Sequence, residues 1–301
     1  MNFIYLHRKS LSCRILFKSF LNFKMYCTRA YHEDIKTFVF LDSETTGLPK
    51  LEQNKTRITE LCIIAIQAEH IRLGVFPRVQ NKINFCFNPN KQISPEATNI
   101  TGLNNNLLEY QPQFNSNVAL LIKNFLNAHQ KPICIVAHNG NRFDYPILRA
   151  ELSRQNCNLD NDVLCIDSLE AFRQIELGAN KIPKAEHKQI PVEFSDGYDQ
   201  ILVEAAEALE KCLIRQTETQ NNKFALKTIG STPTSNNSFK LGDIYTRYTS
   251  KQASNAHNAE GDVNMLIMCA ATLGDEFVDW ANRNAKKFLD IPIMTPGMRL
   301  Y

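Results

Sequence analysis

Apolar residues gather in short runs along this 301-residue chain, and several runs have the length and β-branched content of buried strands. They predict strands at 37–43, 59–68, 82–87, 132–138 and 162–166. Apolar positions at helical spacing predict helices at 116–129, 144–156, 168–176, 240–249, 260–273 and 275–286. Three successive strands with short links favour an antiparallel meander, and the later alternation of strand and helix adds parallel strands. The pattern therefore predicts an α/β fold with a mixed central sheet flanked by helices.

The pattern loosens at about 177–235, which we interpret as an insertion into one domain that spans 35–292. Within it, residues 199–214 have an apolar face and predict an amphipathic helix, either packed for structure or able to dock a partner. Residues 1–34 form a basic N-terminal extension, and 293–301 form a C-terminal tail.

The first candidate chemistry lies where the apolar run of 37–41 turns polar, at Asp42 and Glu44. Residues two apart on a strand point to one face, so both carboxylates would project together. Two close carboxylates repel each other, and a divalent cation between them relieves that repulsion. Oxygen ligands favour magnesium or manganese over zinc. A solvated turn with a helix cap is the alternative interpretation of these residues.

Two further segments carry candidate groups. Asp144 follows a predicted strand and opens a helix with Pro146 in its first turn, so it could also be only a helix cap. Asp262 lies in the first turns of the helix predicted at 260–273, and His257 lies in the segment that enters it. A histidine suits the role of a general base near neutral pH, and activity should fall on acidification because the imidazole must be neutral.

Together these residues resemble the DEDDh group of DnaQ-like 3′ to 5′ exonucleases: D-x-E at Asp42 and Glu44, an aspartate after A-H-N-G, and H-x4-D at His257 and Asp262. Asn258 stands where the DEDDy group has tyrosine. Within the DEDDh group, the resemblance is to the three-prime repair exonuclease (TREX) family. The stretches that carry it are ITELCIIAI (58–66), ITGL (100–103), VAHNGNRFDYPILRAEL (136–152), LGDIYTRY (241–248) and HNAEGDV (257–263).

The resemblance implies a ribonuclease H-like fold and a 3′ to 5′ DNA exonuclease that releases nucleoside 5′-monophosphates from single-stranded or frayed 3′ ends. It implies two Mg²⁺ ions, for which Mn²⁺ may substitute, held by Asp42, Glu44, Asp144 and Asp262. His257 is the implied general base.

The resemblance also implies a set of substrate contacts, namely Glu44, Thr45, Leu48, Ile100, Arg142 and Phe143. Leu48 and Ile100 would wedge the terminal bases without regard to base identity; the alternative is that both are ordinary core residues. Arg142 is a candidate phosphate contact, and an exposed, solvated arginine is the alternative. Phe143 stands where the family commonly has tyrosine, so a hydroxyl contact would be missing here.

In the resembling family, the strand that corresponds to 82–88 joins two subunits, which implies a homodimer through strand pairing. The family also has a basic DNA-binding loop near the insertion. Here the insertion is longer and mixed in charge, so this loop is not carried over to it.

Composition bears mainly on location. Residues 1–30 carry six positive charges and no acid, so without them the net charge changes from +3 to −3. This start resembles a mitochondrial transit peptide; a disordered tail with Met25 as a second start is the alternative. Nine scattered cysteines predict a reduced, intracellular protein of the cytoplasm or nucleus unless residues 1–30 direct it to mitochondria. The chain has no uninterrupted run of 18 apolar residues, which predicts no transmembrane helix.

Other functions stay open at this point. An RNA 3′ exonuclease of the oligoribonuclease kind shares all five chemical residues, and the choice of sugar depends on contacts that the sequence does not reveal. A proofreading subunit of a polymerase and a non-catalytic nucleic-acid-binding protein are the further alternatives. Because all five positions are filled, the sequence favours an enzyme.

Overall fold

The computed structural model describes residues 33–179, 238–252 and 257–298. The chain divides into one unit formed by 1–178 with 238–301 and a second formed by 179–237. The helix expected at 199–214 and the transit-like segment 1–30 lie outside the described residues.

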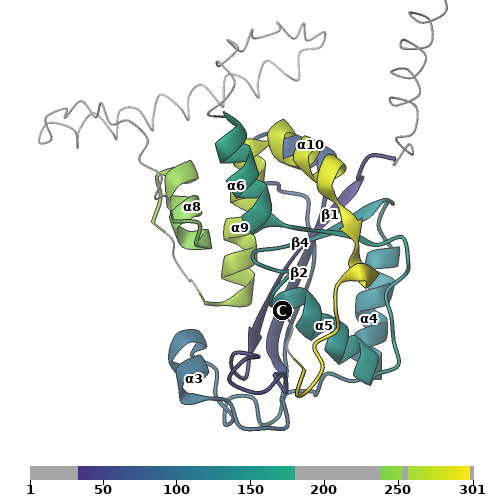
Figure 1. The fold of residues 1–301 in the computed structure, drawn as a ribbon, viewed down its shortest axis with the longest axis vertical. Coiled ribbons are helices and arrows are strands. Elements are labelled where there is room, and N and C mark those ends of the chain that lie inside the picture. Colours follow the sequence, from purple (N-terminus) through teal and green to yellow (C-terminus); the bar gives the residue numbers. More distant parts are fainter. Residues whose placement is uncertain (1–32, 180–237, 253–256, 299–301) are drawn as a thin grey trace, which may run out of the picture. The chain divides into compact units, whose positions relative to one another are not determined.

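A six-stranded sheet forms the centre of the first unit, in the order β3-β2-β1-β4-β5-β6 (Figure 1). β1 pairs antiparallel with β2 and parallel with β4; β2–β3 and β5–β6 are antiparallel, and β4–β5 is parallel. The predicted meander and mixed α/β sheet are thereby confirmed. The strands are β1 Thr37–Thr45, β2 Ile58–Gln67, β3 Asn81–Cys86, β4 Ile133–Ala137, β5 Leu164–Asp167 and β6 Lys286–Lys287.

Helices cover both faces of the sheet. One face packs on α4 and α5 and on the short 3-10 helix η1, and the other packs on α2, α6, α8, α9 and α10 (Figure 1). The helices are α2 Ala68–Arg72, α3 Pro95–Thr101, α4 Ser116–Asn127, α5 Asp144–Arg154, α6 Ser168–Ala179, α8 Leu241–Thr249, α9 Ala259–Leu273, α10 Asp275–Asn284 and η1 Phe288–Asp290. Four elements of the structure were not predicted from the sequence pattern: α2, α3, β6 and η1.

The alternation along β1 decides where its acidic residues point. Val39 and Leu41 belong to the core beside α4 and α5, whereas Phe38 and Phe40 belong to the core beneath α9 and α10. Because successive side chains of a strand point to opposite faces, Asp42 continues the row of Phe38 and Phe40. Burial of these side chains stabilises the strand by about 25 cal/mol per Å² of apolar surface removed from water. The hydrophobic pattern therefore aims Asp42 toward α9.

Residues 294–298 lie against α5 and the loop after β1. The Met294 N–H donates to the Pro146 carbonyl (3.1 Å) and the Gly297 N–H to the Gln53 carbonyl (3.1 Å). The Asn54 amide donates to the Thr295 carbonyl (3.2 Å). This segment therefore joins the loop that follows β1 to the body of the domain.

Among the helices that the structure describes, none has both the length and the apolar content needed to cross a membrane.

Candidate active site

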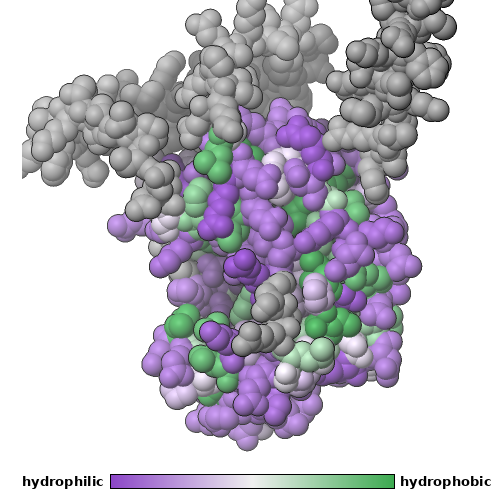
Figure 2. All heavy atoms as spheres, viewed as in Figure 1, coloured by the Kyte–Doolittle hydropathy of each residue, from purple (hydrophilic) through white to green (hydrophobic). Residues whose placement is uncertain are grey.

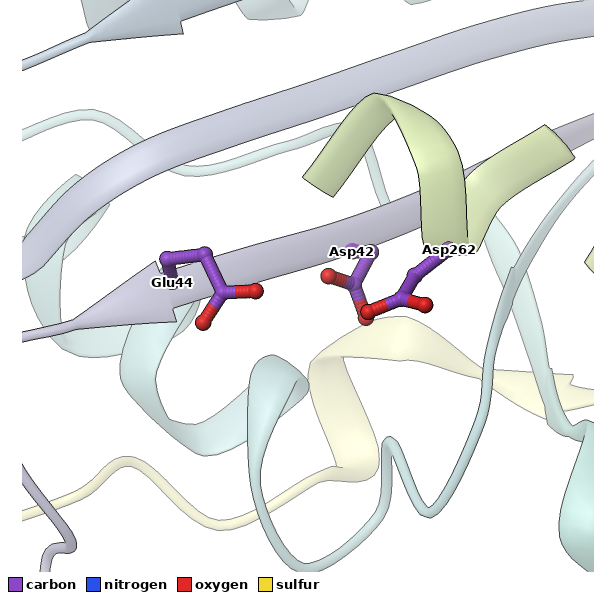
Figure 3. A group of neighbouring side chains, drawn as sticks. All are labelled: Asp42, Glu44 and Asp262. Carbon is purple, nitrogen blue, oxygen red and sulfur yellow. The ribbon is translucent and has the colours of Figure 1, made fainter. Parts of the chain in front are cut away.

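Three carboxylates meet at the end of β1. Asp42 and Glu44 come from the strand and Asp262 from the first turns of α9, and one ligand oxygen from each lies within 4.8 Å of the others. Figure 3 shows the Asp42 and Asp262 carboxylates facing each other, with the Glu44 carboxylate turned toward them along the strand. The predicted pairing of Asp42 and Glu44 on one face is therefore seen in the geometry.

The surroundings disfavour negative charge at these groups. Burial, followed by the charges of Asp144 and Asp262, raises the pKa of Asp42 well above its usual range. Burial and the charge of Asp262 raise the pKa of Glu44 to about 7. Burial also raises the pKa of Asp262, against the lowering effect of the His257 backbone N–H. A bound cation would reverse this balance, because it favours the ionised form of every carboxylate around it.

Asp144 reaches this cluster from the other face of β1. It is the first residue of α5, which packs on the α4 side of the sheet, and its Oδ1 accepts a 2.7 Å hydrogen bond from the Ser43 hydroxyl. Ser43 lies between Asp42 and Glu44 and points to the opposite face. Burial raises the pKa of Asp144 to about 7, and the Ser43 hydrogen bond acts against this rise. Asp144 is therefore electrostatically linked to the three grouped carboxylates without belonging to the group.

The loop that presents Asp144 is fixed from within. A Cβ at Gly140 would lie 2.7 Å from the Ala137 Cβ and 2.8 Å from the Tyr145 ring, so only glycine fits there. The Asp167 carboxylate accepts the N–H groups of Asn139 (2.9 Å) and Asn141 (3.1 Å). The glycine of A-H-N-G therefore serves the close approach between the loop and the aromatic ring that follows it.

His257 lies just outside α9, as predicted, and is exposed. Its backbone has φ +66°, a left-handed conformation that most side chains disfavour. Its N–H donates to Oδ2 of Asp262 (3.0 Å), and the next residue, Asn258, caps the helix by accepting the Gly261 N–H (3.1 Å). The histidine is thus held beside Asp262 by its backbone.

Leu48 and Ile100 are exposed, at 58% and 56% of their surface, so the alternative that they are core residues is excluded. Leu48 lies in the loop after β1 and Ile100 on α3. The Ser94 N–H at the start of α3 donates to the Thr46 carbonyl (2.8 Å), so the two elements are joined. Figure 2 shows one face of the molecule, viewed as in Figure 1, as mostly hydrophilic with apolar atoms in separate patches.

The other predicted substrate contacts lie at the end of β1 and in the loop before α5. Thr45 is buried at the end of β1, and its hydroxyl donates to the Gly47 carbonyl (3.1 Å). Arg142 is exposed in the loop before α5, whereas Phe143 caps that helix and packs partly on the core. Arg142 is therefore available to a phosphate, and Phe143 has a structural role as well.

Three polar residues of the site were not singled out from the sequence: Ser43, Asp167 and Glu60. Glu60 is buried in β2, where its Oε2 accepts the Ala259 N–H at the start of α9 (3.2 Å). Its position inside the largely apolar run ITELCIIAI (58–66) could have marked it, because a glutamate in a buried strand needs a polar partner. Ser43 and Asp167 carried no comparable signal, because a serine or an aspartate at the end of a strand is common.

The donor set fits a hard divalent cation. All grouped ligand atoms are carboxylate oxygens, which magnesium and manganese prefer. Burial and mutual repulsion raise the pKa values of Asp42 and Glu44, and a cation would stabilise their ionised forms. The structure thus supplies both the geometry and the electrostatic reason for a metal at this position.

Comparison with known proteins places the site in a family context. Residues 39–193 match the family model described as RNase T exonuclease. The chain is 28% identical to mouse three prime repair exonuclease 2 over 272 residues, which cover 87% of this chain and 94% of that protein. It is 30% identical to human three prime repair exonuclease 2 over 269 residues, covering 86% of this chain and 92% of that protein.

Among solved structures, E. coli exonuclease I in complex with a dA16 oligonucleotide is similar, with a TM-score of 0.54 and 20% identity. The match covers 83% of this chain and 44% of that chain, so this chain spans less than half of that structure. At this identity the likeness shows the fold alone, and it agrees with the mixed sheet described above.

Proposed function

This chain belongs to the exonuclease family, in its three-prime repair group, and we propose that it removes nucleotides from the 3′ ends of single-stranded or frayed DNA. The observation that carries the proposal is the cluster of Asp42, Glu44 and Asp262 at the end of β1. Two full-length relatives are three-prime repair exonucleases, and the similar bacterial exonuclease binds a dA16 oligonucleotide. A DNA 3′ end is therefore the proposed substrate.

Exonucleases of this family are metal-dependent, and the proposal assigns this chain two Mg²⁺ ions, for which Mn²⁺ can substitute. Asp42, Glu44 and Asp262 would hold one, and Asp144 would complete the set. When bound, two such cations offset the negative charge that develops on the phosphate and on the departing oxygen.

His257 is the proposed general base. A water oxygen attacks the last phosphorus in line while the imidazole accepts the proton of that water, and the bond from phosphorus to the 3′ oxygen breaks. The products are a nucleoside 5′-monophosphate and a strand shortened by one nucleotide with a free 3′ hydroxyl. The exposure of His257 and the bond from its backbone N–H to Asp262 support this role, because an exposed imidazole beside the cluster is accessible to water and substrate.

The 3′-terminal nucleotide is proposed to lie against the loop after β1. Leu48 and Ile100 would contact its base and that of its neighbour, since both are exposed on joined elements. Glu44 and Thr45 would contact the terminal sugar. Arg142 would contact a backbone phosphate, with Phe143 behind it. An apolar grip of this kind gives binding without base preference.

The decisive experiment uses the full chain with 5′-labelled DNA and RNA oligonucleotides of one sequence, in Mg²⁺. We expect a ladder of DNA strands shortened from the 3′ end, with 5′-monophosphates as the released product. Asp262→Asn should remove this activity, since it deletes a carboxylate of the cluster. Asp275→Asn makes the same chemical change at an exposed carboxylate on α10 and should leave the activity unchanged.

Equal degradation by the wild type and Asp262→Asn would contradict the proposal. Faster degradation of the RNA would keep the hydrolase and change the substrate to RNA. Cleavage inside the strand, or from the 5′ end, would contradict the exonuclease direction.

The proposal includes a homodimer through the strand near 82–88. Among the described residues, β3 lies at one end of the sheet order and pairs with β2 alone, which leaves its outer edge for a second copy. Sedimentation equilibrium should give twice the chain mass, and a monomeric mass at micromolar concentration would overturn this part.

An intracellular location also belongs to the proposal. The cysteines that the structure describes are all free, as expected of a protein from a reducing compartment. A fluorescent fusion of residues 1–35 tests the mitochondrial alternative directly: import supports a transit peptide, and a cytosolic signal removes that alternative.

A further inference from the structure

Glu60 is a buried acid that the proposed reaction does not use. It lies on β2 with 6% of its surface exposed, opposite Glu44 on β1 and Cys86 on β3. Its Oε2 accepts the Ala259 N–H (3.2 Å), and its Oε1 lies 3.5 Å from the donating Asn258 amide nitrogen. Both oxygens are therefore turned to the start of α9, which lies across β1 and β2 (Figure 1).

The two residues that Glu60 holds directly follow His257. His257 lies beyond the helix cap, is exposed, and has a left-handed backbone. Because its side chain is exposed, its position depends on the backbone that enters α9. That backbone is held by Asp262 on one side and by Glu60 on the other.

We propose that Glu60 is a positioning residue for His257: by accepting the Ala259 N–H it holds the entrance of α9 against β2 and so places the imidazole over the carboxylate cluster. This inference rests on the proposed function, because it takes His257 as the general base. Glu60 differs from the grouped carboxylates in one decisive respect. Both its oxygens are engaged by α9, and the described cluster consists of Asp42, Glu44 and Asp262 without it.

Asp262 lies within α9, three residues beyond Ala259, and the Glu60 oxygens bond to Asn258 and Ala259 rather than to Asp262. The body of α9 is fixed by Val263 and Leu266, which are buried in the core beneath it. Loss of Glu60 should therefore displace the histidine while the metal-binding carboxylates remain in place. The predicted consequence is a lower kcat with little change in KM.

The first test compares Glu60→Ala with Glu60→Gln in the full chain, on a 5′-labelled single-stranded DNA oligonucleotide. Alanine removes the acceptor and should lower kcat roughly 10- to 100-fold, the usual range for residues that orient a reactive group. Glutamine keeps a carbonyl oxygen for the Ala259 N–H and should retain most of the activity. A glutamine variant as impaired as the alanine variant, or a shift of the Mg²⁺ midpoint in the alanine variant that the glutamine variant does not share, would overturn the proposal.

The second test removes the donor instead of the acceptor. Ala259→Pro deletes the N–H at the first helical position, where proline is tolerated. Asn258 has φ −125° and ψ 124°, the extended conformation required before proline. This variant should lose kcat as Glu60→Ala does, and combining the two should add no further loss. Full activity of a folded Ala259→Pro protein would contradict the role of this hydrogen bond.

The third test separates this inference from the proposed function. In a His257→Asn background, Glu60→Ala should cost nothing further, because the group that it positions is gone. If His257→Asn alone leaves kcat unchanged, the assignment of the base is wrong. If His257→Asn lowers kcat and Glu60→Ala lowers it again by its full factor, the base stands and the positioning role is wrong.

Discussion

The strand β1 and the entrance to α9 both bring groups to the site, and they hold them by different means. β1 is paired with β4 at residues 37–40 and with β2 along its length, and the ladder with β2 fixes Asp42 and Glu44. His257 lies outside any element, exposed and left-handed, and depends on single hydrogen bonds. Two of the three grouped carboxylates thus lie on a paired strand, whereas the proposed general base lies on a segment held by few hydrogen bonds.

β1 and the entrance to α9 also differ in the kind of unfavourable energy that each one carries. The carboxylates on β1 are held in a buried place where their negative charge is disfavoured, as the raised pKa values of Asp42 and Glu44 indicate. The fold tolerates this because the sheet and its two cores are extensive. At the entrance to α9, the cost lies in the backbone conformation of one residue. Variants on the two sides should therefore affect activity and stability in different proportions.

The largest effect is expected from Asp42→Asn. It should abolish measurable nuclease activity, since Asp42 is central to the cluster, and it should raise the melting temperature of the metal-free protein at pH 8 because a buried charge is removed. In a domain of 150–250 residues, each kcal/mol of stabilisation raises Tm by roughly 2–4 °C. Activity assays and thermal unfolding in EDTA measure both. A lower Tm would show that Asp42 serves the fold.

His257→Asn should come next. Removal of a general base costs about 10²- to 10⁴-fold in kcat, and asparagine is chosen because it tolerates the left-handed backbone at this position. Since the side chain is exposed, Tm should not change with or without metal. Single-turnover rates and unfolding curves give the comparison with Asp42→Asn. An equal stabilisation by both variants would remove the distinction between the two regions.

Ser43→Ala tests the link between the two faces of β1. It deletes the hydroxyl that donates to Asp144, so the pKa of Asp144 should rise further and less of the carboxylate should be ionised at pH 7. The apparent affinity for Mg²⁺ should fall about 10- to 100-fold, the range known for groups that support metal ligands. Mg²⁺ titrations of the rate at pH 7 and pH 8.5 should show the larger loss at pH 7. The same loss at both would exclude an effect through ionisation.

The smallest effect is a dependence of stability on pH in the absence of metal. Glu44 and Asp144 have pKa values of about 7 in the fold, above those of unfolded carboxyls, so the folded state binds more protons between these values. Stability in EDTA should therefore fall as the pH rises from about 5 to 7.5, and Tm should fall with it. Mg²⁺ should restore it most at pH 7.5. An equal gain from Mg²⁺ at pH 5.5 and 7.5 would contradict this coupling.

Much of the site could be predicted because local patterns dictate it. The two-residue period of β1 put Asp42 and Glu44 on one face, and the helical spacing after His257 put Asp262 in the first turns of α9. The sequence pattern could not predict from which face of β1 Asp144 approaches. That depends on α5 packing beneath the sheet, which is a tertiary property with no local signal.

The fold shows the same division. Strands with continuous apolar runs were predicted within a few residues, because burial on both faces dictates their composition. β6 consists of Lys286 and Lys287, both exposed, and is a strand only because β5 offers its edge. α3 is short, with none of its residues buried, and begins with a Ser94 cap and Pro95. An element that forms because of a neighbouring strand or a single helix cap leaves no periodic pattern of apolar residues, so the sequence pattern does not predict it.

The contact between β2 and the start of α9 joins residues 199 positions apart in the chain. During translation, Asp42 and Glu44 leave the ribosome early, while His257 and Asp262 emerge only after almost all of the domain has been made. A nascent chain that stops before His257 lacks both the proposed general base and Asp262, the third carboxylate of the cluster. Protein synthesis thus delays competence to cut nucleic acid until folding is nearly complete, and prematurely terminated chains would be harmless to the DNA around them.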